Sequence, residues 1–284
     1  MKLSRIKWPQ AIVITLLLAS APMYNAAAQA IDSSAPEPTY ADLADLANAS
    51  QIVLRAQIRK QAEVEPERSP GLQPGFIRLY IEARTGALIS GSAPIGESLR
   101  YLVDVPFDSR GKAPKLKKRE VLLFARPVSG SPGVIRLVGP RAQLMWDEAL
   151  EARLRPILGE LLAADSPPVV TGVRDALAVA GNLAGESETQ MFLDTQNGDP
   201  VSITVVRRPG QSPVWGVSWS EIVDQAARPP QSHTIAWYRL ACFLPARLPP
   251  QANLSRDAAM RNLANTDYAF VMSALGRCER NLAG

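Results

Sequence analysis

The chain has 284 residues, 46% of them hydrophobic, and carries 31 Lys and Arg against 27 Asp and Glu. Residues 1–30 hold three basic residues and no acidic one, which leaves 28 basic against 27 acidic residues in the remainder. A net charge near +1 provides no general attraction to nucleic acid or anionic lipid, so we expect no nucleic-acid partner.

The start of the chain predicts a cleavable signal peptide. A positively charged stretch, residues 2–7, precedes an apolar stretch, residues 11–23, and residues 28–30 give the small-x-small pattern of a signal-peptidase site. The apolar run is shorter than the roughly 20 residues that span a bilayer as a helix. We therefore expect cleavage between Ala30 and Ile31, no transmembrane span in the mature chain, and a periplasmic or secreted location. An uncleaved anchor is the alternative.

The first half of the mature chain is dominated by strand patterns. Residues 31–38 indicate a flexible lead-in, and Thr39 can cap a short helix at residues 40–47. Alternating or continuous apolar patterns then predict strands at residues 52–59, 76–84, 99–105, 120–128 and 134–138. Five short strands without helices between them suggest a closed or nearly closed antiparallel barrel.

A helix follows these strands. Apolar residues recur at steps of three and four over residues 146–164, and Pro156 is expected to kink or restart the helix. The Asp-Ser-Pro-Pro sequence of residues 165–168 indicates a linker. We thus predict a barrel domain at residues 39–164 and a second domain at residues 169–284.

The second domain is expected to be α+β, a small antiparallel sheet with helices at its C-terminal end. Residues 169–180 favour a strand but would serve almost as well in a helix. The predicted hairpin turns at Asn197-Gly198, a pair that tolerates positive φ. The expected strands are residues 190–195, 201–206 and 215–223, and the expected helices are residues 232–243, capped by Ser232, 255–263, capped by Ser255, and 266–282. The whole chain is therefore predicted to be mainly β plus α+β.

Two cysteines, Cys242 and Cys278, are the only ones in the chain. In an oxidising compartment an even pair forms a disulfide more readily than a metal site. We therefore predict that the two are joined.

The sequence offers few candidates for catalysis. His233 is the only histidine, which excludes the usual histidine-rich zinc and haem sites. Nine residues along one helix, roughly 13 Å, would separate it from Cys242, so a Cys–His nucleophile is not expected. Glu186 and Glu188 form either a solvated turn or an acid–base or calcium-binding pair.

Other patterns have simpler interpretations. The basic run at residues 112–119 favours a solvated loop over a ligand site. Four aromatic residues could form a carbohydrate-stacking platform but are more typical of a core: Trp215, Trp219, Trp237 and Tyr238. No nucleotide-binding motif occurs, and no cofactor is predicted.

Two resemblances add to these patterns. The strands of residues 52–138, with the helix at residues 146–164, resemble the OB-type barrel of secreted netrin-like and metalloproteinase-inhibitor-like (TIMP-like) modules. The N-terminal cysteine of those modules is absent, so their inhibitory chemistry is not implied. Residues 185–193, 205–210 and 237–245 are similar to exported proteobacterial proteins of uncharacterised activity.

Together these observations predict a non-catalytic periplasmic protein whose barrel binds a protein or peptide partner in the cell envelope. The alternative is an envelope hydrolase that acts on peptide or glycan bonds through Glu186 or Glu188.

Overall fold

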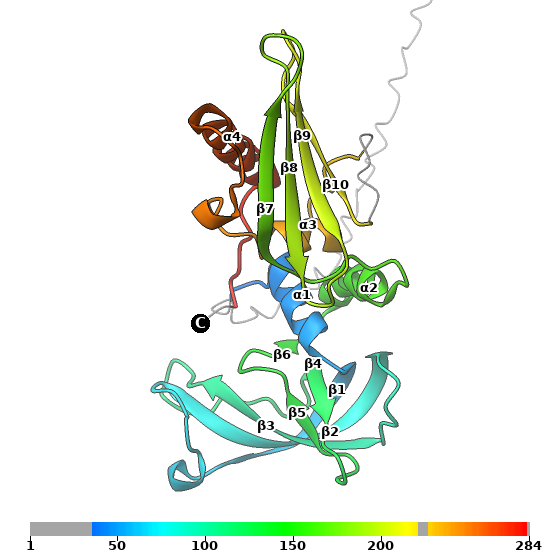
Figure 1. The fold of residues 1–284 in the computed structure, drawn as a ribbon. Coiled ribbons are helices and arrows are strands. Elements are labelled where there is room, and N and C mark those ends of the chain that lie inside the picture. The colour runs from blue at the N-terminus through cyan, green and yellow to red at the C-terminus, as the bar shows by residue number, and fades with distance from the viewer. Residues whose placement is uncertain (1–35, 221–226, 283–284) are drawn as a thin grey trace, which may run out of the picture. The chain divides into compact units, whose positions relative to one another are not determined.

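The structure is a computed structural model that describes residues 36–220 and 227–282 (Figure 1). It is mainly β, with two antiparallel sheets and a few helices, which confirms the coarse fold class. The predicted cleavage site between Ala30 and Ile31 lies outside the described residues.

The first sheet is built from six strands, ordered β3-β2-β1-β4-β5, with β6 also paired to β4. Their bounds are β1 (Ile52–Glu63), β2 (Phe76–Ser90), β3 (Ser98–Pro106), β4 (Glu120–Pro127), β5 (Ile135–Leu137) and β6 (Gln143–Met145). One face of the sheet forms its own apolar cluster, in which Leu54, Leu79 and Leu123 have no exposed surface. The short β6 was not predicted, because three residues are too few to show a period.

The described strands do not close into a complete barrel. The two outer strands of the path, β3 and β5, approach at a single isolated parallel bridge between Arg100 and Val134. The sheet therefore curls until its outer strands meet at one point and stays open beyond it.

The second sheet is an antiparallel meander ordered β10-β9-β8-β7. Its strands are β7 (Val170–Ala180), β8 (Ser187–Thr195), β9 (Val201–Arg207) and β10 (Val214–Ser218). The segment that was also compatible with a helix is thus a strand. Gly198 has φ +82°, as the predicted Asn197-Gly198 turn requires. The predicted end of the last strand, up to residue 223, falls partly outside the described residues.

The helix α2 (Glu148–Leu162) follows the first sheet and contains Pro156 without a break. The helix is therefore not restarted at Pro156, and a kink at this residue stays a prediction. Its start is fixed by Asp147, whose side chain accepts a hydrogen bond from the N–H of Leu150 at 2.7 Å. Residues 165–168 lie between α2 and β7, and separation of two domains there stays a prediction.

The helices of the C-terminal part differ from the expected ones at their ends. Helix α3 (Ile235–Ala241) is capped by Thr234 and not by Ser232, because His233 has φ 60°, a left-handed backbone that no helix contains. The two helices expected at residues 255–263 and 266–282 are instead the single helix α4 (Ala258–Leu275), which lies against β7 and β8 (Figure 1).

Both ends of α4 have a local cause. Asp257 caps its start by accepting the N–H of Met260 at 2.9 Å, whereas Ser255 accepts the N–H of Ala178 in β7. Gly276 has φ +74° and ends the helix. Residues 276–282 are therefore not helical, although the sequence predicted a helix up to residue 282. Two short 3-10 turns, η1 (Pro66–Arg68) and η2 (Pro250–Ala252), complete the elements.

Helix α1 (Tyr40–Ala49) is capped by Thr39, as predicted. Its Leu43 and Ala44 have no exposed surface, and they belong to a large apolar cluster that also contains Phe124 of β4 and Ile203 of β9. The helix contacts β4, α2 and α3.

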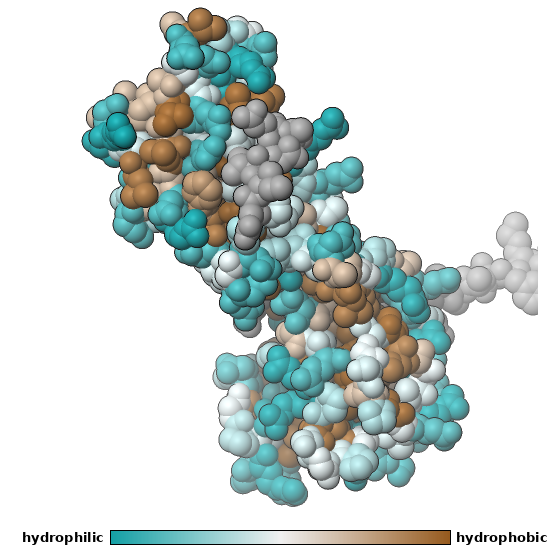
Figure 2. All heavy atoms as spheres, turned by 45° about the vertical axis from the view of Figure 1, so that its right-hand side comes forward, coloured by the Kyte–Doolittle hydropathy of each residue, from teal (hydrophilic) through white to brown (hydrophobic). Residues whose placement is uncertain are grey.

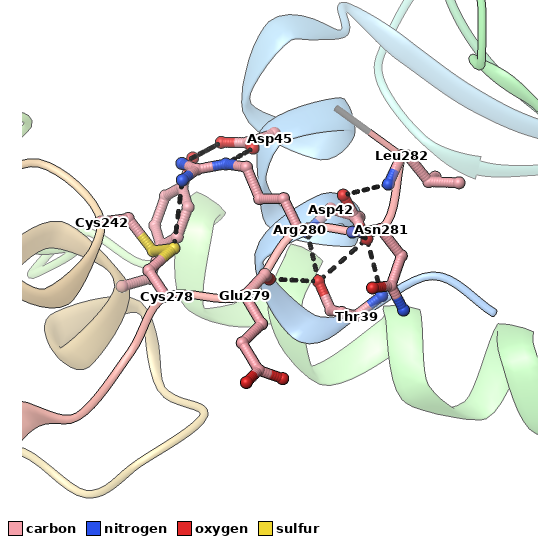
Figure 3. Close-up of polar contacts among 10 residues, drawn as sticks. Thr39, Asp42, Asp45, Cys242, Cys278, Glu279, Arg280, Asn281 and Leu282 are labelled. Carbon is pink, nitrogen blue, oxygen red and sulfur yellow. Dashed lines mark hydrogen bonds and ion pairs between the residues drawn. A yellow bond between two sulfur atoms is a disulfide. The ribbon is translucent and has the colours of Figure 1, made fainter. Parts of the chain in front are cut away.

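A C-terminal tail, residues 276–282, is held against α1 (Figure 3). Cys278 is joined by a disulfide to Cys242 at the end of α3, with a Cα–Cα distance of 5.1 Å. Asp42 accepts the backbone N–H of Asn281 at 2.9 Å and of Leu282 at 3.0 Å. Asp45 accepts the guanidinium of Arg280 at 2.6 Å.

The disulfide is expected to stabilise the chain. The cysteines are 36 residues apart, and closing a loop of this size removes unfolded-chain entropy worth about 4 kcal/mol in the simple model. Replacing both cysteines (Cys242→Ser with Cys278→Ser) should lower the melting temperature by roughly 5–15 °C, measured by calorimetry. An unchanged melting temperature would show that the polar contacts of the tail suffice without the bond.

The attachment of the tail should depend on pH through Asp42. Burial raises the pKa of this carboxyl, but hydrogen bonds from the N–H groups of Thr39, Asn281 and Leu282 outweigh burial and hold the pKa below its ordinary value. Because the folded-state pKa is the lower one, the stabilisation is complete above the ordinary Asp value of about 3.9 and is lost as the pH falls through the folded-state pKa.

Hydrogen exchange measures this effect at the tail. We expect the protection factors of the Asn281 and Leu282 amides to fall on acidification below about pH 4. Asp42→Asn should lower them already at neutral pH, at a cost of about 1–3 kcal/mol. Equal protection at pH 6 and pH 3 would contradict the assignment.

Candidate functional site

A groove with a volume of about 950 Å³ lies at the open side of the first sheet. One wall is β3, with Leu102, Val103 and Asp104, and the opposite wall is β5 with Gly139 and Pro140 of the loop after it. Tyr80 of β2 lies beside Leu102 in the strand register and forms part of the floor. The groove is therefore the gap where the two outer strands fail to pair.

The backbone N–H and C=O groups of successive β3 residues point alternately toward β2 and away from it. Its odd-numbered positions pair with β2, since Phe107 donates to the carbonyl of Gly75 and Thr85 donates to the carbonyl of Glu97. In an antiparallel ladder the intervening residues direct their N–H and C=O groups to the other side. Accordingly Arg100 donates its N–H to the carbonyl of Gly133 at 2.8 Å, across the gap.

Leu102 and Asp104 are the next residues of β3 in the same phase as Arg100. Within the described residues no β-bridge joins either of them to β5, because the bridge between the two strands is limited to Arg100 and Val134. Pro106, which has no N–H, takes the following position in this phase. The groove thus exposes a short length of strand edge with free backbone donors and acceptors.

The charges of the groove are unevenly distributed. Arg78 and Asp104 form a two-point ion pair at 2.7 and 2.8 Å, and the hydrogen bonds that Arg78 donates to the Asp104 carboxylate raise the pKa of Arg78. Arg100 and Arg136 are exposed, and neither joins an ion pair with a carboxylate among the described residues. The end of the groove near these two arginines is therefore positive, whereas Glu63 and other acidic residues line another part.

Exposed apolar surface alone does not single out this groove. Leu102 is 50% exposed, but large apolar side chains are also exposed on other elements, such as Leu183 at 64%. Figure 2 shows several apolar patches on one face of the molecule, separated by hydrophilic side chains. The groove is distinguished by its volume together with the free backbone of β3.

The two glutamates considered for hydrolysis have local partners. One carboxylate oxygen of Glu186 accepts the N–H groups of Asn182 and Leu183 at 3.0 and 3.2 Å, inside the β7–β8 turn. Glu188 accepts the side-chain amide of Gln190 at 2.7 Å. A hydrolytic role for this pair stays a prediction, to be tested by activity screens with Glu186→Gln and Glu188→Gln.

His233 is exposed and stacks on Tyr40 with a ring-centroid distance of 5.6 Å. It precedes α3, whereas Cys242 follows the last residue of α3 and is bonded to Cys278 in the disulfide. The two do not form a nucleophilic pair, which agrees with the expectation although its premise of a shared helix is wrong.

The four aromatic residues do not form a stacking platform. Trp215, Trp237 and Tyr238 are buried, and Trp219 is partly buried. Trp237 donates its indole N–H to the carbonyl of Leu275 at 2.8 Å. The core interpretation is therefore correct for three of them.

A buried polar cluster links the second sheet to α4 and was not predicted. Asp267 has no exposed surface, accepts the hydroxyl of Thr189 at 2.5 Å, and pairs with Arg207 at 2.6 Å. Its enclosure indicates a packing role. In the described part of the chain no cluster of His, Cys, Asp and Glu side chains could hold a metal ion.

The sequence contained one signal for the groove. Leu102 is an apolar residue in the polar phase of a strand whose buried phase is Leu99, Tyr101, Val103 and Val105. An apolar side chain that faces outward on an edge strand is typical of a contact surface.

No protein-family model matches the chain, and no curated protein matches it. Within residues 36–220 and 227–282, no helix has the length and hydrophobicity of a membrane span.

Proposed function

We propose that this protein is a non-catalytic binding protein of the cell envelope, and that the groove between β3 and β5 binds a protein or peptide segment. The single observation that carries the proposal is the strand edge at Leu102 and Asp104, whose free backbone groups face a groove of about 950 Å³. Unpaired edges are the surfaces that proteins use to bind extended segments.

The proposed architecture of the first sheet is an OB-type barrel. The strand order β3-β2-β1-β4-β5 and the parallel approach of β3 to β5 at Arg100 and Val134 support this fold. In barrels of this type the face of the second and third strands takes ligands. The groove involves the corresponding strands, with Tyr80 and Leu102 adjacent in the register.

The proposed location is the periplasm or the exterior. The charged start, the short apolar stretch and the small-x-small pattern at residues 28–30 support export, as does the disulfide.

The binding proposal is tested by two matched substitutions of exposed leucines. Peptides selected from a random decapeptide library on the mature protein should lose at least about tenfold in affinity with Leu102→Glu, because a carboxylate then replaces an apolar contact of the groove. Leu183→Glu, on the β7–β8 turn, should leave their affinity unchanged. Calorimetry measures both affinities, and the proposal fails if the two variants behave alike.

Export is tested on the protein purified from cell envelopes. Mass analysis should find a mature chain that begins at Ile31. An intact Met1 would contradict the signal peptide and would favour the uncleaved anchor.

A further inference from the structure

We infer that the groove binds its partner by strand addition to β3, and that the partner is an extended segment in which apolar residues alternate with acidic ones. The inference rests on the proposed function and specifies the chemistry of its ligand.

The backbone supports strand addition over a short, defined length. Leu102 and Asp104 direct two N–H and two C=O groups into the groove, so an added strand can form up to four hydrogen bonds with them. The bond from Arg100 to Gly133 ends the free edge on one side, and Pro106 ends it on the other. A free edge this short favours a single added segment over a growing sheet.

The side chains of the groove specify an alternating partner. Successive side chains of an added strand point to opposite faces. Those on the inner face meet Val103, Ile135 and Leu137, which belong to or pack against the apolar cluster of the first sheet. Those on the outer face meet Leu102 and the exposed arginines Arg100 and Arg136.

The unpaired arginines favour acidic residues on the outer face. The bridge between Arg100 and Val134 places Arg136 across from Leu102 in the parallel direction, so both cations flank the same part of the free edge. Exposed cations attract carboxylates mainly at low ionic strength, and complementary charge selects the partner.

Two other occupants fit less well. A second copy of the chain, paired symmetrically about Leu102, would need the N–H of Arg100, which already binds Gly133. A nucleic acid would place phosphates near Arg100 and Arg136, but it has no peptide backbone that could pair as a strand with the N–H and C=O groups of Leu102 and Asp104.

Direct binding with synthetic probes tests the inference. The probes are an octapeptide of alternating Val and Glu, its Val and Lys counterpart, a Val and Glu octapeptide that is N-methylated at every second residue, and a dT octanucleotide. We expect the mature protein to bind only the first, measured by fluorescence anisotropy at low salt. Preference for the dT probe would overturn the inference in favour of nucleic acid, and concentration-dependent dimerisation that blocks the peptide would overturn it in favour of a second copy.

A backbone variant separates strand addition from other peptide binding. Leu102→Pro removes the N–H that faces the groove and leaves the pairing of β3 with β2 intact, since proline is tolerated on edge strands in this orientation. It should weaken the Val and Glu peptide by about tenfold or more, equivalent to about 1.4 kcal/mol. Leu102→Ala, which keeps the N–H, should weaken it less.

The charge requirement has its own variant. Arg100→Gln with Arg136→Gln should reduce the affinity for the Val and Glu peptide and remove most of its salt dependence, whereas Arg110→Gln with Lys117→Gln, outside the groove, should not.

The outcomes distinguish peptide binding in the groove from strand addition to β3. If the Val and Glu peptide binds and Leu102→Glu blocks it, but Leu102→Pro and N-methylation have no effect, strand addition is wrong and peptide binding stands. If no peptide of either charge binds in a manner that Leu102→Glu blocks, both are wrong. The N-methylated peptide keeps the test decisive even if Leu102→Pro fails to fold.

Discussion

The burial of helix α1 is the interaction on which the rest of this structure depends. A helix of ten residues is marginal in water by itself, so its stability comes from packing. Leu43 and Ala44 are fully enclosed, in the apolar cluster that also contains Phe124 of the first sheet and Ile203 of the second. The polar side of the helix is fixed as well, because Asp42 and Asp45 hold the C-terminal tail. A short helix therefore serves as common support for several elements.

Strands could be predicted from the sequence where buried and exposed residues alternate regularly. The residues of β3 that face the core alternate strictly, and Asn197-Gly198 demands a hairpin, so strands and fold class could be predicted. Helix ends could not, because several capping residues lie close together and the choice depends on backbone conformations of their neighbours. The left-handed backbone at His233 selects Thr234 over Ser232, and the positive φ of Gly276 ends α4 well before Leu282.

Local sequence patterns could not predict the groove between β3 and β5. The groove exists because pairing between β3 and β5 stops after Arg100 and Val134, residues that are far apart in the sequence. Only Leu102, apolar in a polar phase, marked it locally. Conversely, the spacing of Glu186 and Glu188 resembled a catalytic pair, whereas the first carboxylate accepts hydrogen bonds from its own turn. A two-residue spacing of carboxylates does not distinguish these cases.

The attachment of the tail to α1 also constrains the order in which the chain can fold. Thr39 and Asp42 emerge from the ribosome early, but their partners Glu279, Asn281 and Leu282 are made more than two hundred residues later. The first helix cannot therefore reach its final environment while synthesis is in progress. The packing of α1 against the tail is therefore completed only after residues 278–282 have been made, when most of the apolar contacts of the helix are already available.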